Sequence, residues 1–153
     1  MKILVVSDSH GDVAGMLTCV DMLRPRHILF LGDGLRDADE VRERFPDIPM
    51  DVVAGNCDLG RREYGEKLIE IEGHRILMMH GHTRNVKNGL LEASYAAREA
   101  GAQILLYGHT HCSKVVRNGD FWIMNPGSIG NYPRSYGVLT IEGKTVDCSV
   151  YRL

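Results

Sequence analysis

Short apolar runs alternate with amphipathic segments along the first third of the chain. Three runs rich in large apolar residues predict buried strands: Ile3 to Val6, His27 to Leu31 and Asp51 to Ala54. After Asp12, a candidate helix N-cap, apolar residues recur at helical spacing until Pro25. A second, shorter helix is predicted from Asp37 to Phe45. Strands that alternate with helices over short connections favour a parallel sheet with right-handed crossovers.

The second half of the chain changes to hairpins around one more helix. A helix is predicted from Asn88 to Ala100, because Leu91, Ala97 and Ala100 are spaced to face a core. A buried strand, Ile104 to Tyr107, follows it. Three hairpins are predicted: Leu68–Ile71 with His74–Met79, Lys114–Arg117 with Phe121–Met124, and Tyr136–Ile141 with Thr145–Tyr151. This order predicts an α/β fold in which helices lie outside a sandwich of two mixed sheets.

The composition is typical of one folded domain spanning residues 1–153. Hydrophobic residues make up 44% and charged residues 25% of the chain, which excludes a disordered protein. The formal net charge is -2, so nucleic-acid binding is not indicated by charge. No apolar run approaches the roughly 20 residues of a bilayer span or forms a signal peptide, so we expect a cytoplasmic protein with no membrane partner. The 4 cysteines form no C-x-x-C pair, and we expect reduced thiols.

Side chains of metal-binding type gather where the predicted strands end. In open α/β sheets the ligand crevice lies beyond the carboxyl ends of the strands, so segments far apart in sequence meet there. Each of these strand ends also carries a glycine, which lets loop backbone crowd a small site. The candidate ligands are Asp8, His10, Asp33, Asn56, His80, His109 and His111.

Turn chemistry alone does not explain this pattern. Asp and Asn favour turns because their side chains bond the local backbone, which would account for any single strand end. His-Gly-His at 80–82 and Gly-His-Thr-His at 108–111 differ, because histidine is the commonest metal ligand and is not a preferred turn residue. Imidazole mixed with carboxylate and amide oxygen suits manganese, iron, nickel or zinc. So many ligands exceed one zinc site and suit two ions that share a carboxylate.

Five blocks of the sequence, in order, resemble the calcineurin-like metallophosphoesterase superfamily. They are Asp8-x-His10, Gly32-Asp33, Gly55-Asn56-x-Asp58, His80-Gly81-His82 and Gly108-His109-Thr110-His111. The small size and the late Asn125-Pro126-Gly127-Ser128 resemble its compact bacterial and archaeal phosphodiesterase branch. The resemblance implies a four-layer αββα sandwich of two mixed β-sheets flanked by helices. It also implies two divalent ions, the first held by Asp8, His10, Asp33 and His111 and the second by Asp33, Asn56, His80 and His109.

These blocks predict a metal-dependent phosphoesterase, and a phosphodiesterase in particular. A metal-bridging hydroxide would attack phosphorus in line with the departing ester oxygen, with manganese expected first and nickel, iron or zinc as alternatives. Asp33 and Asn56 would serve catalysis as metal ligands. His82 is predicted to contact the substrate phosphate or to support a ligand. Asp58 is predicted to orient His10 or a neighbouring loop, with a surface turn as the alternative.

Cys57 is the one departure from the family pattern. The wider family has a histidine here, which is thought to protonate the leaving group or to steady the transition state. A thiol with a pKa of about 8.5 is a poorer acid at neutral pH than an imidazole with a pKa of about 6.5. We therefore predict that Cys57 occupies the leaving-group position and that diesters are preferred over alkyl monoesters. A small buried hydrophobe is the alternative for this residue.

Two other functions stay open on the sequence alone. A phosphomonoesterase acting on a small metabolite or a phosphoprotein would use the same metals with a different pocket. A non-catalytic scaffold for protein interactions is the second, because the retromer-scaffold subunit of eukaryotes resembles this fold, although the complete ligand set argues against it. The predicted partner is a small phosphodiester substrate, and exposed strands in the last hairpins leave a homodimer open.

Several further residues are assigned smaller roles. Arg61, Arg62 and Arg84 follow the ligand blocks and would either bind a second phosphate or base of the substrate or remain solvated. His27 and His74 are predicted to be structural or solvent-facing. The turn at 125–128 is predicted near the mouth of the site, shaping the backbone or contacting phosphate.

Overall fold

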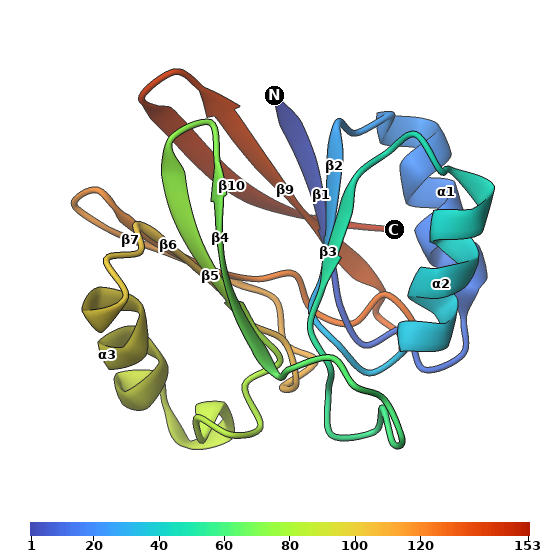
Figure 1. The fold of residues 1–153 in the computed structure, drawn as a ribbon, viewed down its shortest axis with the longest axis horizontal. Helices are drawn as coiled ribbons and strands as arrows, with labels where there is room; N and C mark the ends of the chain where they lie inside the picture. The colour runs from blue at the N-terminus through green and yellow to red at the C-terminus, as the bar shows by residue number, and fades with distance from the viewer.

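The computed structural model describes residues 1–153 and contains two mixed five-stranded sheets (Figure 1). The first sheet has the strand order β10-β9-β1-β2-β3. Its parallel strands are β1 (Lys2–Val6), β2 (His27–Phe30) and β3 (Met50–Val52). Beside β1 runs the antiparallel strand β9 (Ser135–Glu142), and β10 (Thr145–Arg152) pairs antiparallel with β9 at the edge of the sheet.

The second sheet has the strand order β4-β5-β6-β8-β7. Its parallel strands are β5 (His74–Met79), β6 (Ile104–Leu106) and β8 (Phe121–Asn125). Its edges are the antiparallel strands β4 (Glu66–Ile71) and β7 (Lys114–Asn118). The three predicted hairpins are therefore present as β4–β5, β7–β8 and β9–β10.

Helices cover the outer faces of both sheets. On the first sheet lie α1 (Val13–Leu23) and α2 (Leu35–Arg44), and on the second lies α3 (Leu91–Glu99), preceded by the short 3-10 helix η1 (Val86–Asn88). Along β1, Ile3 and Val5 belong to the core between the sheets, whereas Leu4 and Val6 belong to the core under α1 and α2. This alternation buries both faces of the strand, and it confirms the predicted four-layer αββα sandwich.

None of the α-helices has the length and apolarity that a membrane span requires.

The prediction for the third helix was wrong in its start and in turning Leu91 toward the core, whereas Ala97 is buried as predicted. The helix begins at Leu91, whose side chain is 82% exposed, while Ala93 and Ala97 are buried against the second sheet. Successive helical residues are rotated by about 100°, so Leu91 lies on the side opposite Ala93. Small residues on the inner face allow the helix to approach the sheet closely, and Leu91 is left in solvent.

The starts of the first two helices also differ in detail from the prediction. The second helix begins at Leu35, so Asp37 lies within its first turn. Asp12 does precede the first helix, but its side chain makes no capping hydrogen bond. Its carboxylate instead lies 3.3 Å from the guanidinium of Arg134. The carboxyl ends of β1, β2, β3, β5 and β6 lead into loops that meet at one edge of the sandwich, in the lower part of Figure 1.

Candidate metal centre

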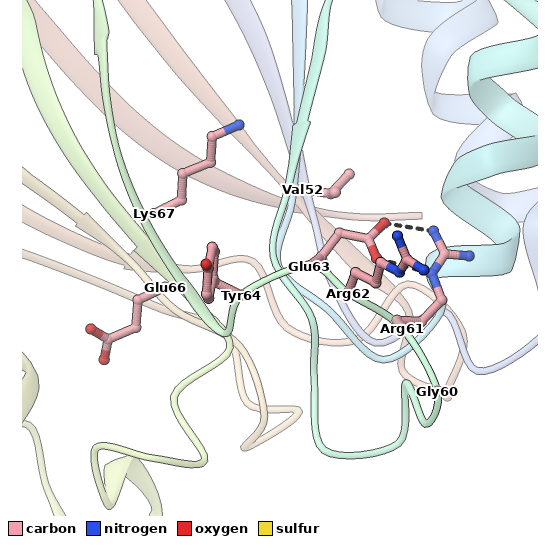
Figure 2. Close-up of a pocket in the computed structure, with 8 residues that line it drawn as sticks. All are labelled: Val52, Gly60, Arg61, Arg62, Glu63, Tyr64, Glu66 and Lys67. Atoms are coloured by element: carbon pink, nitrogen blue, oxygen red, sulfur yellow. Dashed lines mark hydrogen bonds and ion pairs between the residues drawn. The ribbon is translucent and has the colours of Figure 1, made fainter.

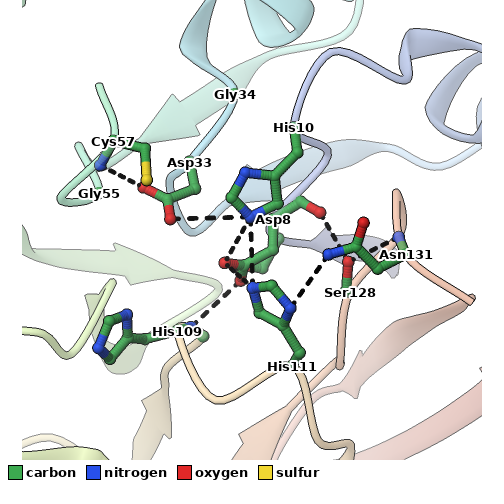
Figure 3. A network of polar contacts seen from close by, with 12 residues as sticks. Asp8, His10, Asp33, Gly34, Gly55, Cys57, His109, His111, Ser128 and Asn131 are labelled. Carbon is green, nitrogen blue, oxygen red and sulfur yellow. Dashed lines mark hydrogen bonds and ion pairs between the residues drawn. The ribbon is translucent and has the colours of Figure 1, made fainter. Parts of the chain in front are cut away.

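The loops after five strands bring the seven predicted ligands to one place. Figure 3 shows five of them: Asp8, His10, Asp33, His109 and His111. Asp33, after β2, lies in the middle of the group. Its Oδ2 atom is 3.8 Å from Nε2 of His10 on one side and 3.4 Å from Nε2 of His80 on the other. The side chains therefore form two groups that share one carboxylate.

The first group joins the β1 loop to the loop after β6. Nε2 of His111 lies 3.1 Å from Oδ1 of Asp8 and 3.3 Å from Nε2 of His10. Nε2 of His10 is 3.6 Å from the same Asp8 oxygen. Two imidazole nitrogens and a carboxylate oxygen thus converge on one point.

The second group joins the loops after β3, β5 and β6. Nε2 of His80 lies 3.0 Å from Oδ1 of Asn56 and 3.2 Å from Nδ1 of His109. The same nitrogen faces Asp33. One imidazole nitrogen cannot satisfy three such neighbours by hydrogen bonding, because a ring nitrogen donates or accepts a single bond in a given tautomer. A cation at this point would satisfy them together.

A second observation, at Asp8, also indicates that these side chains could bind divalent cations. Oδ1 of Asp8 is fully buried and accepts no hydrogen bond, although the other oxygen of this carboxylate accepts bonds from the Ser7 hydroxyl and the His109 amide. A buried carboxylate oxygen without a partner is costly unless a cation faces it. Mixed nitrogen and oxygen donors suit first-row metals.

Charge in this region also favours a cation. Burial alone would raise the pKa of the Asp33 carboxyl, but hydrogen bonds with His80 and the Cys57 amide hold this pKa well below its usual range. Burial would lower the pKa of His80, and the Asp33 and Asp8 carboxylates outweigh burial and raise it. Burial, with help from His80, lowers the pKa of His109. The Asp33 carboxylate therefore stays ionised and places a negative charge at the centre of the group.

The imidazole of His80 is held by the core of the protein. Its side chain is fully buried, and its Nδ1 lies 2.8 Å from the carbonyl oxygen of Leu31. A carbonyl only accepts, so Nδ1 carries the proton and Nε2 is left free to bind a metal.

The loop after β8 braces the first group from behind. Ser128 donates its hydroxyl to the carbonyl of Asp8 at 2.8 Å and accepts the amide of Asn131 at 2.9 Å. The side-chain amide of Asn131 lies 3.2 Å from Nδ1 of His111. The turn predicted near the mouth of the site is buried from Asn125 to Ser128. Of its two predicted roles, the structure shows the shaping of backbone, because Ser128 holds the backbone at Asp8. Asn131 was missed in the sequence, where nothing marks it.

Asp58 orients a loop and does not contact His10. Its carboxylate accepts four backbone amides, those of Asp33, Gly34, Leu35 and Gly55, at 2.7 to 3.0 Å. Of the two predicted targets, the neighbouring loop is the one that the structure shows, and the surface-turn alternative is wrong. Through these bonds Asp58 ties the loop that carries Asp33 to the loop that carries Asn56.

Asp37 has a similar role that the sequence analysis did not find. Its Oδ2 atom accepts the hydroxyl of Ser9 at 2.6 Å and the amide of Gly11 at 2.9 Å. These bonds hold the backbone on both sides of His10. The predicted helix start at Asp37 hid this role, because an acidic residue at a helix start already has an ordinary explanation.

His82 and Cys57 lie beside the two groups. The ring of His82 is centred 5.3 Å from that of His80, and its buried Nδ1 has no partner. Burial, followed by the charge of His80, lowers the pKa of His82. Cys57 is exposed, so the buried-hydrophobe alternative is wrong. Loss of water around the sulfur, then the charge of Asp33, raises the pKa of this thiol.

The backbone is left-handed at five of the seven candidate ligands. Positive φ angles occur at Asp8 (56°), His10 (45°), Asp33 (61°), His109 (69°) and His111 (61°). Such angles are uncommon for residues other than glycine, and they persist where surrounding structure holds them. Glycines permit this crowding: a Cβ atom on Gly55 would stand 2.1 Å from Oδ1 of Asp33, and one on Gly108 would stand 2.1 Å from Oγ of Ser7.

The arginines and remaining histidines mostly have partners elsewhere. Arg61 lies 2.6 Å from Oε2 of Glu63 (Figure 2). It also lies 2.7 Å from Oδ2 of Asp39. Arg84 forms two bonds with Glu66. His27 lies 2.8 Å from Asp51, and His74 lies 2.7 Å from the carbonyl oxygen of Gly143, which makes both histidines structural.

Known proteins resemble this chain over most of its length. Residues 1–144 match the model for the calcineurin-like phosphoesterase superfamily domain. The chain is 34% identical over 165 aligned positions to the "Probable metallophosphoesterase YsnB" of Bacillus subtilis (strain 168), across 99% of this chain and 90% of that protein. It is 28% identical over 170 positions to the phosphodiesterase YfcE of Escherichia coli (strain K12), across 91% and 87%.

Solved structures share the fold. A predicted phosphoesterase from Streptococcus pneumoniae TIGR4 superposes with a TM-score of 0.84 and 26% identity, over 99% of this chain and 88% of that one. Wild-type Vps29 from Entamoeba histolytica, solved in complex with zinc, superposes with a TM-score of 0.78 and 22% identity, over 99% of each chain. The second likeness concerns the fold alone.

Proposed function

The chain belongs to the calcineurin-like phosphoesterase superfamily, and we propose that it hydrolyses phosphodiester bonds at a centre of two divalent metal ions. The resemblance found in the five sequence blocks is thereby confirmed. The observation that carries the proposal is the convergence of two donor groups on Asp33, with a buried Asp8 oxygen that accepts no hydrogen bond.

We assign each group of side chains to one ion. Asp8, His10, Asp33 and His111 would hold the first ion, and Asp33, Asn56, His80 and His109 the second. Two bound divalent ions would offset charge on the phosphate oxygens and make water a nucleophile at neutral pH. Among the metals that suit this donor set, manganese is the first to test, then nickel, iron and zinc.

The proposed reaction is direct hydrolysis. The oxygen of water forms a bond to phosphorus in line with the departing ester oxygen, whose bond to phosphorus breaks, and a proton from water ends on the departing alcohol. No ester with the protein forms. Asp58 and Asp37 hold the loops that carry Asp33 and His10. His82, whose ring lies beside that of His80, would hydrogen-bond a phosphate oxygen through its imidazole.

Two hollows beside the centre favour a diester over a monoester. The first, about 500 Å³, is lined by His10, Asp33 and Cys57 among others, and we call it the Arg36 hollow after another lining residue. The second, about 460 Å³, is lined by His82 and Tyr64. A diester places two substituents around phosphorus, whereas a monoester has one and needs one hollow. The phosphodiesterase among the relatives agrees with this choice.

Cys57 narrows the kind of diester further. Its thiol stands within 4.8 Å of the ligand atoms of His10 and Asp33, in the Arg36 hollow. A thiol replaces the imidazole that the wider family has here, so protonation of the departing alcohol is weak and aryl esters should react faster than alkyl esters. The variant Cys57→His is expected to raise alkyl ester turnover relative to aryl ester turnover. If the ratio of alkyl ester turnover to aryl ester turnover were unchanged in this variant, Cys57 would not occupy the leaving-group position.

The deciding experiment uses metal-stripped protein. Hydrolysis of bis(4-nitrophenyl) phosphate and of 4-nitrophenyl phosphate is measured after manganese, nickel, zinc or magnesium is added back. We expect manganese or nickel to restore diester turnover, and Asp33→Asn to lower it at least about 1000-fold. Asp47→Asn, which replaces an exposed aspartate with no ion pair, is the matched control. A monoester preference would favour the phosphatase alternative, and no turnover with any metal would favour the scaffold.

A further inference from the structure

One arginine beside the centre has no partner. Arg36 lines the Arg36 hollow together with His10, Asp33 and Cys57. It is exposed, and its guanidinium takes part in no ion pair or hydrogen bond of the protein. A cation therefore borders the space into which one substituent of a bound phosphate ester would extend.

The other arginines near this region are engaged or face elsewhere. Arg61 also lines the Arg36 hollow, but it is paired with Glu63 (Figure 2) and with Asp39. Arg62 is exposed and lines a different hollow, of about 650 Å³, that contains neither a candidate ligand nor His82. Of the three arginines named from the sequence, none is a free cation beside the centre, whereas Arg36 is.

The carboxylates of the Arg36 hollow are turned to the backbone and leave Arg36 unpaired. Asp37 accepts the hydroxyl of Ser9 and the amide of Gly11. Asp58 accepts four backbone amides. Asp33 accepts the amide of Cys57 and lies in the proposed metal centre. An anion for Arg36 would therefore have to come from a ligand.

We propose that Arg36 binds a second anionic group, a phosphate or a carboxylate, on one of the two alcohols of the diester. This inference rests on the proposed function, because it places the scissile phosphate at the metal centre. A guanidinium recognises either group with two parallel hydrogen bonds. Leu59, which is 87% exposed, lines the same hollow and offers apolar contact to the ring or sugar that carries the anion. The substrate class is thus a phosphodiester with a further negative charge, such as a diester of a nucleotide that carries a second phosphate group.

The test compares matched substrates with and without the added charge. One pair is 4-nitrophenyl phenyl phosphate and its 3-carboxyphenyl counterpart. The other is the 4-nitrophenyl ester of thymidine 5′-phosphate without and with a 3′-phosphate. We expect the wild-type protein to show a KM about tenfold lower for the charged member of at least one pair. This ratio should shrink as salt is raised, because the arginine is exposed.

Arg36→Gln should reduce the KM ratio to about one. The control is Arg44→Gln, which replaces an exposed, unpaired arginine on the same helix about 12 Å away, and which should keep the wild-type ratio. The pair that shows the effect identifies carboxylate or phosphate as the group bound.

Three results would overturn the inference. One is a wild-type ratio near one for both pairs. Another is an Arg36→Gln variant that keeps the wild-type ratio, including one that loses turnover equally on all substrates, because that marks a structural role. The third is absence of turnover on all four diesters with every metal, which overturns the proposed function itself and is thereby distinguished from the first two.

Discussion

His80 and His10 stand on opposite sides of Asp33, yet the fold holds them very differently. The side chain of His80 is fully buried, and a core carbonyl, that of Leu31, accepts its Nδ1 proton. The side chain of His10 is 29% exposed, and the hydrogen-bond and ion-pair partners of its ring are all other candidate ligands. His111, the partner of His10, is 37% exposed and is steadied by Asn131.

This difference indicates which half of the centre is already ordered before a metal binds. On the His80 side the central imidazole is already fixed by the core, so this ligand gains little order when a metal binds. On the His10 side, two exposed imidazoles must be ordered by the metal itself. We therefore expect the second ion, on the His80 side, to bind more tightly than the first.

The largest effect is expected for His80→Ala. This change removes a donor of the tighter position and leaves the buried Leu31 carbonyl without a partner. We expect turnover to fall at least about 1000-fold, one equivalent of metal to be lost, and the free energy of unfolding to fall by about 1 to 3 kcal/mol. Activity assays, metal analysis and urea unfolding measure the three quantities. His74→Ala, at a half-buried histidine away from the centre, is the control for turnover and metal content, and a His80→Ala variant that still binds two ions would refute the comparison.

The next effect concerns the order in which the ions bind. Calorimetric titration of metal-stripped protein with manganese should show two sites whose dissociation constants differ about tenfold or more. His10→Ala should weaken the looser site and leave the tighter one in place. If the same variant weakened the tighter site instead, the assignment of the exposed half to the looser ion would be reversed.

A smaller effect is expected from Asn131→Ala. With Nε2 of His111 on a metal, Nδ1 carries the proton and Asn131 would accept it through its amide oxygen. We expect about tenfold weaker binding of the looser ion, and Asn131→Asp should restore it because a carboxylate accepts the same proton. Asn88→Ala is the control, at an exposed asparagine that contacts only Asn85. Unchanged affinity in Asn131→Ala would show that the loop backbone alone places His111.

The smallest effect, and one outside the centre, is expected for Asp51→Asn. The hydrogen bond from His27, with a further contribution from Lys67, outweighs burial and lowers the pKa of Asp51 to about 2. A lowered pKa means that the carboxylate stabilises the fold above its unfolded pKa of about 3.9, and that this is lost as the pH falls through about 2. We expect Asp51→Asn to lower the free energy of unfolding by about 1 kcal/mol at pH 6, allowing for partial exposure, and by nothing at pH 2. Both metal affinities should stay unchanged. A change in either would show that the contacts of Asp51 with His27 and Lys67 affect the metal centre.

The arrangement of strands and helices could be predicted from the sequence, because the strands are apolar runs that end in polar loops. The parallel order of β1, β2 and β3 follows from their alternation with helices, and the edge where Asp8 and Asp33 meet follows from that order. Histidines at strand ends stand out because turns do not call for them. Residue type and position were therefore enough to collect the candidate ligands.

The supporting contacts could not be predicted, because they depend on how segments pack. Leu91 and Ala93 have equal claim to a core until the rotation of the helix is known. Asn131 reaches His111 across a separation of 20 residues along the chain, and only the folded loop brings them together. Asp58 was predicted to orient a histidine or a loop, and the choice is decided by four amides whose positions no pattern in the sequence describes.

At five positions of the centre, the side chain needed for activity lowers the stability of the fold, because the backbone there is left-handed. These positions are Asp8, His10, Asp33, His109 and His111. Glycine adopts such angles without penalty, whereas each other residue carries a cost of about 1 kcal/mol there. A laboratory selection that rewarded only thermal stability would therefore enrich glycine at these positions and erase the chemistry. Natural variation filtered by activity would do the opposite, keeping strained side chains while the rest of the chain compensates.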